Sequence, residues 1–290
     1  MKKIVKDALA QIDYFLYRNG FKKCKIRKVH SVAETIDELI YTQKSMVRFG
    51  DGEIAIIRGK QASFQKGNSK LVEDLKRILS YQYDNMIVTI PDIFGDLSIY
   101  RKESRQFWKD HLLFFRKIYE KYCDTSKEYF NTSISRFYYT LEDKSQSERW
   151  ISKIRQIWKD RDVVIVEGVG THNGVGNDLL DTAKTIERII GPARDAYEKL
   201  EEIFKTCVEY PKDRLFLISL GPTAKPLTER LFLEGYRVLD IGNLDMEYEW
   251  YLGKVSKKEK IPKHDMIDIE TNIRAGYTDY LAQIKKRIEL

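Results

Sequence analysis

Short runs of apolar and β-branched residues alternate along this chain with longer segments of helical periodicity. The short runs have the length and composition of buried strands, and the longer segments repeat apolar residues at the spacing of a helix. Strands that alternate with helices build a mainly parallel sheet with helices on both faces. We therefore expect an α/β fold whose strands are residues 46–49, 86–90, 163–166, 215–220 and 237–241.

The predicted helices fill the intervals between these strands. Ser31 followed by Glu34 is a capping-box pattern, and it opens a helix that extends to Gln43. The other predicted helices are residues 4–15, 53–58, 71–80, 104–122, 147–159, 179–190, 196–206 and 223–234. We divide the chain into a helical N-terminal extension over residues 1–30, a main domain over residues 31–255, and a C-terminal extension over residues 256–290 that packs on the same domain.

The composition limits the compartment and the partners. The chain has 51 basic and 44 acidic side chains, and its net charge of +7 favours an anionic partner. Basic and acidic residues are interleaved, which argues against a nucleic-acid-binding protein. Three widely spaced cysteines indicate a reducing compartment, and neither a signal peptide nor a spanning segment is predicted. We expect a cytoplasmic protein with at most peripheral membrane contact, and homo-oligomerisation stays open.

An acidic pair follows the first predicted strand. Asp51 and Glu53 alternate with Gly50 and Gly52, so two carboxylates stand in a turn between a strand end and a helix start. Carboxylate oxygens are ligands that Mg²⁺ and Mn²⁺ prefer, and ligands of parallel sheets bind beyond the carboxyl ends of the strands. The pair therefore predicts a metal site beside a phosphate.

The same acidic spacing recurs twice. Asp245 and Glu247 follow the last predicted strand beside a tyrosine and a tryptophan, and carboxylates next to aromatic rings resemble a sugar site. Acids that solvate one face of a helix with aromatic core residues would give the same pattern. The third copy, Asp268 with Glu270, follows no predicted strand, and we set it aside.

Two further loops at strand ends carry groups that fit a phosphate. The loop after residues 163–166 is rich in glycine and could wrap a phosphate with backbone N–H groups, although it has neither the dinucleotide fingerprint nor a Walker lysine. The loop after residues 215–220 turns directly into a helix, and three of its side chains could meet a diphosphate. These are Ser219, Thr223 and Lys225. An irregular surface loop and a proline-started helix are the structural alternatives.

Four motifs, in this order and over residues 30–255, resemble the bacterial glycosyltransferases of GT-D fold. The motifs are Arg48–Glu53, Gly174–Asp178, Ser219–Ala224 and Asp240–Gly242 with Glu247–Trp250. The resemblance implies a Rossmann-like α/β fold and a transferase that moves a hexose, typically glucose, from a UDP-sugar with Mn²⁺ or Mg²⁺ as cofactor. It also implies a glycan or glycoprotein acceptor in the synthesis of surface glycoproteins or polysaccharides.

The resemblance assigns roles to individual residues. Asp51 and Glu53 would hold the metal beside the diphosphate, with Arg48 as a neighbouring phosphate contact. Asp245 and Glu247 would form the acceptor side, and we expect Glu247 rather than Asp245 to take the proton of the acceptor hydroxyl. The other residues expected to bind the donor are Gly50, Gly52, Gly174, Gly176, Asn177, Asp178, Ser219, Gly221, Thr223 and Lys225.

The chain departs from the family pattern in two places. Asn243 stands where a histidine is usual, and residues 169–172 have Val-Gly and Thr-His in place of Glu-Lys and Thr-Arg. These changes leave the donor sugar open. The alternatives to a transferase are a metal-dependent phosphohydrolase or nucleotidyltransferase, which would use the same carboxylates on phosphorus, and a catalytically silent relative that binds sugar nucleotides.

Overall fold

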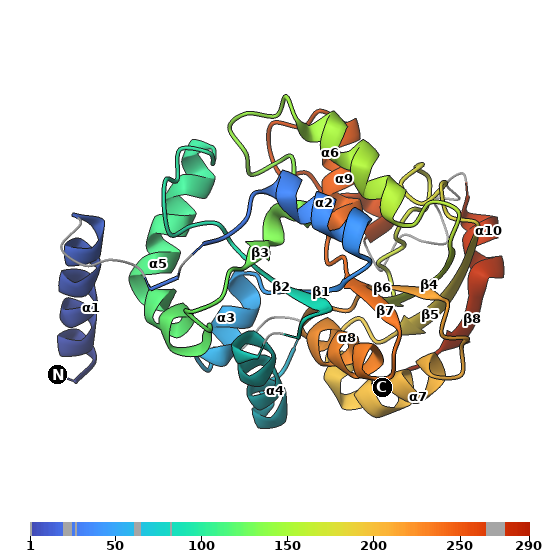
Figure 1. Ribbon diagram of the computed structural model, residues 1–290, viewed down its shortest axis with the longest axis horizontal. Coiled ribbons are helices and arrows are strands. Elements are labelled where there is room, and N and C mark those ends of the chain that lie inside the picture. Colours follow the sequence, from blue (N-terminus) through green and yellow to red (C-terminus); the bar gives the residue numbers. More distant parts are fainter. Residues whose placement is uncertain (1, 20–24, 27, 61–64, 82, 265–275) are drawn as a thin grey trace.

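The computed structural model describes residues 2–19, 25–26, 28–60, 65–81, 83–264 and 276–290 (Figure 1). Its strands are β1 (Ser45–Arg48), β2 (Met86–Ile90), β3 (Phe130–Asn131), β4 (Asp162–Gly168), β5 (Thr185–Gly191), β6 (Leu215–Ser219), β7 (Arg237–Asp240) and β8 (Ile284–Arg287). They form one sheet in the order β3-β2-β1-β7-β6-β4-β5-β8, in which all neighbours are parallel. The sheet confirms the predicted Rossmann-like α/β fold.

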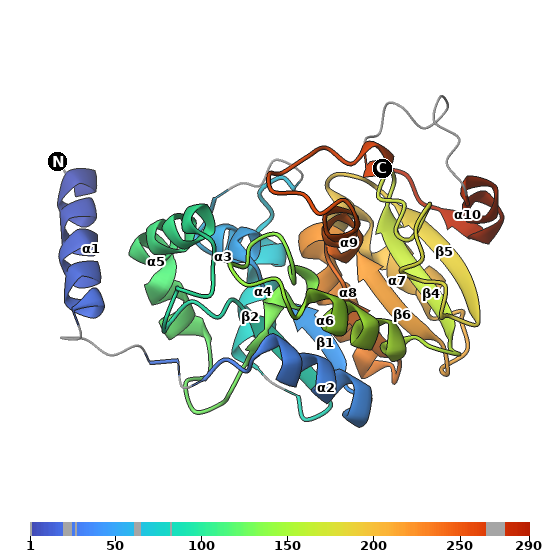
Figure 2. The same ribbon diagram turned by 90° about the horizontal axis from the view of Figure 1, so that it is seen from above.

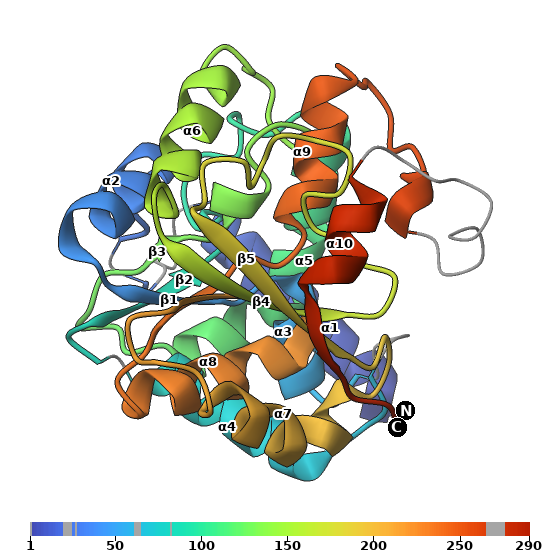
Figure 3. The ribbon, with the colours of Figure 1, turned by 90° about the vertical axis from the view of Figure 1, so that its right-hand side faces the viewer.

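Helices cover both faces of the sheet (Figure 3). One face carries α2 (Val32–Thr42), α6 (Ser147–Ile154) and α9 (Leu244–Leu252). The other carries α3 (Asp51–Ile57), α4 (Ser69–Ser80), α5 (Lys102–Tyr122), α7 (Leu200–Cys207) and α8 (Ala224–Leu233). The remaining helical elements are α1 (Lys2–Arg18), α10 (Tyr277–Gln283) and the 3₁₀ turns η1 (Thr132–Ser135), η2 (Arg155–Ile157), η3 (Ala196–Lys199), η4 (Gly221–Thr223) and η5 (Pro262–His264).

The side chains of the central strands alternate between the two cores. Along β4, Val163 and Ile165 join the core with α2, α6 and α9, whereas Val164 and Val166 join the core of the opposite face. A parallel strand that is covered on both sides therefore has apolar residues at every position. For this reason the five predicted strands could be recognised as continuous β-branched runs.

The predicted helix over residues 179–190 is wrong. Its leucines and isoleucines have helical spacing, but residues 179–184 form turns and bends, and β5 pairs with β4 along its whole length. Pairing with a neighbouring strand outweighs local periodicity in so short a segment, and the β-branched content of residues 185–190 was the contrary signal. The strands β3 and β8 were not predicted, because β3 has only two residues and β8 is mostly charged.

Arg188 ties β5 to β4 and to the loop that follows β4. Its Nη1 lies 2.6 Å from Glu167 Oε1, and its Nη2 donates to the Asn173 carbonyl oxygen at 2.8 Å. Glu167 Oε2 accepts the backbone N–H of Asn173 at 2.8 Å and its side-chain amide at 2.7 Å. Both charges are buried, so removal of either one would leave the other without compensation.

The helix α1 lies at one end of the molecule, far from the C-terminus of the chain (Figures 1 and 2). α1 packs on α5 through an ion pair between Asp13 and Arg116 and through the Tyr17 hydroxyl, which donates to the Phe94 carbonyl oxygen at 2.7 Å. β8 pairs with β5 at the far edge of the sheet. Within the described residues, no helix combines the length and the apolar character needed to cross a membrane.

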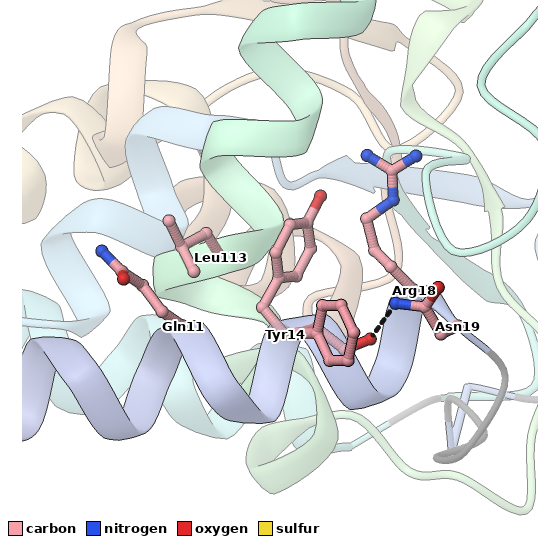
Figure 4. Close-up of a pocket in the computed structure, with 6 residues that line it drawn as sticks. Gln11, Tyr14, Arg18, Asn19 and Leu113 are labelled. Atoms are coloured by element: carbon pink, nitrogen blue, oxygen red, sulfur yellow. Dashed lines mark hydrogen bonds between the residues drawn. The ribbon is translucent and has the colours of Figure 1, made fainter.

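A hollow of about 460 Å³ lies between α1 and α5 (Figure 4). Its lining consists of Gln11, Tyr14, Phe15, Arg18, Asn19 and Leu113. The lining contains no carboxylate, and none of the four sequence motifs contributes to it. The candidate site is therefore placed from the topology of the sheet.

Arg188→Met tests the placement of residues 185–191 in a strand. We expect the variant to lose about 3–5 kcal/mol of unfolding free energy, because it leaves Glu167 buried without its counter-charge. The double variant Glu167→Gln/Arg188→Met should recover part of that loss. Urea unfolding followed by circular dichroism measures both, and a loss of less than about 1 kcal/mol in Arg188→Met would contradict the placement.

Candidate active site at the carboxyl edge of the sheet

The strands β1 and β7 are parallel neighbours, but the chain leaves them toward opposite edges of the sheet. From β1 the chain continues outward to β2 and β3, whereas β7, β6 and β4 lie on the other side of β1. In open parallel sheets, ligands bind in the crevice at such a switch point, outside the carboxyl ends of the strands. Residues 49–53 follow β1 and residues 241–243 follow β7, so the first acidic pair stands at this point.

Lys225 joins the carboxyl ends of β1 and β7. Gly50 precedes α3, and its N–H donates to Glu53 Oε2 at 2.8 Å. Glu53 Oε1 lies 2.9 Å from Lys225 Nζ, and the same ammonium lies 3.0 Å from Asp240 Oδ2. Asp240 Oδ2 also accepts the backbone N–H of Arg48 at 3.2 Å. Two carboxylates and one ammonium thus close the sheet where the two strands end.

Asp51 is the open carboxylate of this cluster. Burial alone would raise the pKa of Glu53, but Lys225 outweighs burial and holds the pKa of Glu53 below its ordinary value. Asp51 is exposed in the first turn of α3, and no described residue forms an ion pair with it. Desolvation by the surrounding protein and the charge of Glu53 raise the pKa of Asp51. A cation beside Asp51 would stabilise its charged form.

Arg48 reaches the same edge with a buried side chain. Its Nε donates to the Thr132 carbonyl oxygen at 3.4 Å, and its Nη1 lies 4.0 Å from Asp240 Oδ1. Gly242 makes room for the guanidinium, because a Cβ at this position would lie 2.0 Å from Arg48 Nη1. The Ser219 hydroxyl donates to the Gly242 carbonyl oxygen at 2.7 Å and holds this turn in place.

The glycines of the candidate site differ in their importance. Gly221 has a φ of +54°, which favours glycine, and its carbonyl oxygen accepts from Lys225 Nζ at 3.2 Å. Gly50 has a φ of −100°, and a Cβ there would approach only Glu53 Oε2, at 3.4 Å. A Cβ at Gly52 would meet nothing within 4 Å. Sterics therefore do not require glycine at position 50, before the acidic pair, or at position 52, between the two acids.

The glycine-rich loop after β4 folds around Asp245. Asp245 Oδ1 accepts the N–H of Gly174 at 2.8 Å and the Asn177 amide at 2.9 Å. Gly174 has a φ of +75°, and a Cβ there would lie 2.6 Å from Leu180 Cδ1, so this position requires glycine. Gly176 also has a positive φ, of +74°. The loop is held from within by a carboxylate of the second acidic pair.

Asp245 is a fully buried carboxylate that lies against Lys263 and His264. Lys263 Nζ and His264 Nε2 each lie 2.8 Å from its Oδ2. The same Lys263 ammonium lies 2.6 Å from Glu249 Oε1 and donates to the Val175 carbonyl oxygen at 2.9 Å. Asp245 therefore connects α9, the glycine-rich loop and η5, which is the bonding of a structural residue.

Glu247 is also fully buried, and only one of its oxygens is held by backbone groups. Its Oε1 accepts the backbone N–H groups of Tyr138, at 2.9 Å, and of Tyr139. Its Oε2 forms no hydrogen bond with a described residue and lies 3.6 Å from Arg136 Nη1. Burial raises the pKa of Glu247 above its ordinary value. A carboxylate with a raised pKa and a free oxygen can accept a proton.

The aromatic residues beside the second pair belong to the core. Tyr248 and Trp250 are buried with the residues under α2 and α6. The Tyr248 hydroxyl donates to Asp178 Oδ1, and Asp178 Oδ2 also pairs with Arg155 at 2.6 Å. The alternative in which these aromatic residues belong to the core is therefore confirmed, but the two acids are buried and do not solvate the helix. Asp178, expected to bind the donor, is engaged by protein groups.

The model of the family described as glycosyltransferases of GT-D fold matches residues 46–269. The chain belongs to the GT-D-fold glycosyltransferase family. It is 41% identical over 234 residues to the probable glycosyl transferase Gly of Streptococcus gordonii, and 39% identical over 241 residues to the glycosyltransferase GlyD of Streptococcus pneumoniae. The alignments cover 80% and 83% of this chain but 34% and 29% of the relatives, so the chain spans about a third of their length.

Solved structures share the fold of this GT-D chain. A structure described as a new glycosyltransferase from Streptococcus sanguinis is 39% identical, with a TM-score of 0.83 over 90% of this chain and 99% of that one. A structure of the domain of unknown function 1792, described as having a distinct glycosyltransferase fold, is 35% identical, with a TM-score of 0.85 over 91% of this chain and 97% of that one. The family predicted from the four motifs is confirmed.

The sequence did not predict that Arg136, Lys263 and His264 lie at the candidate site of the GT-D chain. Arg136 follows η1, and the two-residue strand before it gives no periodic signal. Lys263 and His264 belong to a lysine-rich stretch that looks solvated, yet Asp245 draws both inward. His172, in the glycine-rich loop, hydrogen-bonds through Nδ1 with the Lys263 carbonyl oxygen at 2.6 Å. The third acidic pair, Asp268 with Glu270, lies outside the described residues.

The open carboxylate at the switch point fits a divalent cation whose coordination shell is completed by a bound ligand. Among the described residues, no group of three or more histidine, cysteine, aspartate or glutamate side chains is placed so that it could hold a metal ion by itself. Asp51 is open, whereas both oxygens of Glu53 already have partners. Mg²⁺ bound with nucleotides takes one or two carboxylates and completes its shell with phosphate oxygens and water. Asp51 fits that arrangement, with Glu53 beside it.

Acid should weaken the fold through Asp245. Burial opposes its ionisation, but His264 and Lys263 outweigh burial and lower the pKa of Asp245 to about 2, against about 3.9 in an unfolded chain. A depressed folded-state pKa stabilises the fold above the unfolded-state pKa, and this stabilisation is lost as the pH falls toward the folded-state value. The stability advantage of the wild type over Asp245→Asn should therefore shrink by about 2 kcal/mol between pH 5 and pH 2.

Urea unfolding at several pH values measures this advantage. The comparison of the two proteins cancels the titration of groups that are distant from Asp245, because their surroundings are the same in both. An advantage that stays constant over this pH range would show that Asp245 is not ionised in its ion pairs.

Proposed function

We propose that this GT-D domain transfers a hexose, with glucose as the expected sugar, from a UDP-sugar to a glycan acceptor of a surface glycoprotein or polysaccharide. The observation that carries the proposal is the open carboxylate of Asp51 next to buried Arg48 at the β1–β7 switch point. The glycosyltransferase names of the relatives support the class of reaction.

The donor diphosphate is proposed to lie outside the ends of β1 and β7. Arg48 offers a guanidinium that Thr132 and Asp240 hold in place. Lys225, by contrast, is occupied by Glu53 and Asp240 and positions the edge of the site. Bound at Asp51, a divalent cation would act as a Lewis acid that neutralises charge on the departing UDP.

The turns after β6 and β4 are proposed to border the donor. Thr223 is fully buried and its hydroxyl has no hydrogen bond with a described residue, so it keeps a donor group for a ligand. Ser219 acts through the Gly242 carbonyl that it holds. Asn177 is bonded to Asp245 and Glu249, so it shapes the glycine-rich loop and leaves nucleotide contacts to backbone groups.

Glu247 is proposed as the base of the transfer. The acceptor oxygen bonds to the anomeric carbon, and the bond from this carbon to the phosphate oxygen breaks with its electron pair passing to UDP. The acceptor proton passes to Glu247 Oε2, which is free of hydrogen bonds to described residues. Both oxygens of Asp245 lie within 3.0 Å of Lys263 Nζ, and we assign Asp245 the positioning of the glycine-rich loop.

A panel of nucleotide sugars tests the proposed reaction. The wild type should release UDP from UDP-glucose faster with MnCl₂ than with EDTA. It should release no inorganic phosphate from p-nitrophenyl phosphate. Asp51→Asn should lower the rate by about 100-fold or more, because it removes the charge that would hold the cation. Asp213→Asn is the matched control, since Asp213 is exposed at the amino end of β6, on the opposite edge of the sheet.

Two other outcomes would replace the proposal. Metal-dependent hydrolysis of the simple phosphoester would favour a phosphohydrolase that uses the same carboxylates on phosphorus. Binding of UDP-sugars without turnover, with and without glycan acceptors, would favour a catalytically silent relative. Full activity of Asp51→Asn without added metal would remove the role given to Asp51.

A further inference from the structure

Arg136 stands between the two halves of the candidate site. It follows η1 at the carboxyl end of β3, and its Nη1 lies 3.6 Å from the buried Oε2 of Glu247. Its charge also acts on Asp51 and on Arg48, at the end of β1. The guanidinium of Arg136 therefore lies beside the proposed base on α9, and its charge acts at the proposed diphosphate site at β1.

The pairing of Arg136 is loose in comparison with other arginines. Charge-assisted hydrogen bonds between guanidinium and carboxylate groups measure about 2.7–2.9 Å. Arg188 and Arg155 meet their carboxylates at 2.6 Å, whereas Arg136 stays 3.6 Å from Glu247 and its side chain is 30% exposed. Arg136 thus keeps N–H groups that a ligand can use.

Arg48 and Arg136 repel each other. Burial lowers the pKa of the Arg48 guanidinium, and the positive charge of Arg136 also acts to lower it. Arg48 has Asp240 at 4.0 Å and Arg136 has Glu247 at 3.6 Å, so neither guanidinium forms a close ion pair. Two guanidinium groups whose charges act on each other, and which lack a close carboxylate, attract an anion. A planar guanidinium can donate two parallel hydrogen bonds to one phosphate, which an ammonium cannot do.

We infer that Arg136 binds the terminal phosphate of the UDP leaving group and, in doing so, moves away from Glu247. This inference rests on the proposed function. The electron pair of the broken sugar–phosphate bond passes to an oxygen of that phosphate, and Arg136 meets the charge that develops there. Glu247 Oε2, released from Arg136, accepts the proton of the acceptor hydroxyl.

The local chain geometry links the two events. Glu247 Oε1 is held by the backbone N–H groups of Tyr138 and Tyr139, which lie two and three residues after Arg136. The carboxylate therefore stays in place through Oε1 while Arg136 turns toward the phosphate. Glu247 and the terminal phosphate of UDP compete for Arg136. A purely structural role for Arg136 would not predict this competition.

Isothermal titration of UDP and UMP into the full chain, in a buffer with MnCl₂, tests the inference. Arg136→Met should weaken UDP binding by about 10- to 100-fold, the value of a charge-assisted hydrogen bond. UMP binding should change by less than about threefold, because UMP lacks the terminal phosphate. Arg136→Lys should lose less than Arg136→Met, since it keeps the charge without the planar fork.

Two further variants separate competition from damage. Glu247→Gln should bind UDP as tightly as the wild type or more tightly, because Arg136 loses its competing carboxylate. Arg230→Met is the matched control: Arg230 is 29% exposed and pairs with Glu201 on α7 at 2.5 Å. Its UDP affinity should not change. Circular dichroism melting of every variant checks that the fold is retained.

The outcomes distinguish this inference from the proposed function. If Arg136→Met binds UDP with the affinity of the wild type, the inference is overturned and the proposed function stands. Equal losses of UDP and UMP affinity in Arg136→Met, or weaker UDP binding in Glu247→Gln, would also overturn it. Absence of UDP binding to the wild type would overturn the proposed function itself.

Discussion

The buried ammonium of Lys225 holds the fold and the candidate site together. A buried charge is costly unless it is paired, and Lys225 has Glu53 at 2.9 Å and Asp240 at 3.0 Å. These carboxylates belong to α3 and β7, and Asp240 also receives the backbone N–H of Arg48 from β1. The same contacts close the sheet at its switch point and occupy Glu53, so Asp51 is the carboxylate that stays open.

The two acidic pairs follow one physical rule. Residues two apart on a helix point in different directions, so the members of an Asp-x-Glu pair on a helix meet different surroundings. At the start of α3, Glu53 turns inward to Lys225 and Asp51 stays open. On α9, Asp245 is enclosed by Lys263 and His264, while Glu247 keeps Oε2 free of hydrogen bonds to described residues. Each pair thus supplies one structural carboxylate and one with a free oxygen.

The sequence predicted what depends on local chain chemistry. The strand ends after β1, β6 and β7 could be located because buried parallel strands are continuous apolar runs that end at glycine or proline. Residues 179–190 were misassigned because only the pairing of β5 with β4 decides between strand and helix there. The sequence also could not show that Arg136 faces Glu247, or that Lys263 is buried, because these contacts join segments about 110 and 20 residues apart.

The central claim is that a nucleotide sugar binds at the β1–β7 switch point, and a crystal structure with UDP and MnCl₂ tests it most directly. We predict the diphosphate outside the carboxyl ends of β1 and β7, with Arg48 in hydrogen-bond contact and the cation between Asp51 and the phosphates. A nucleotide bound in the hollow between α1 and α5, or at any place without contact to Arg48 and Asp51, would contradict the claim.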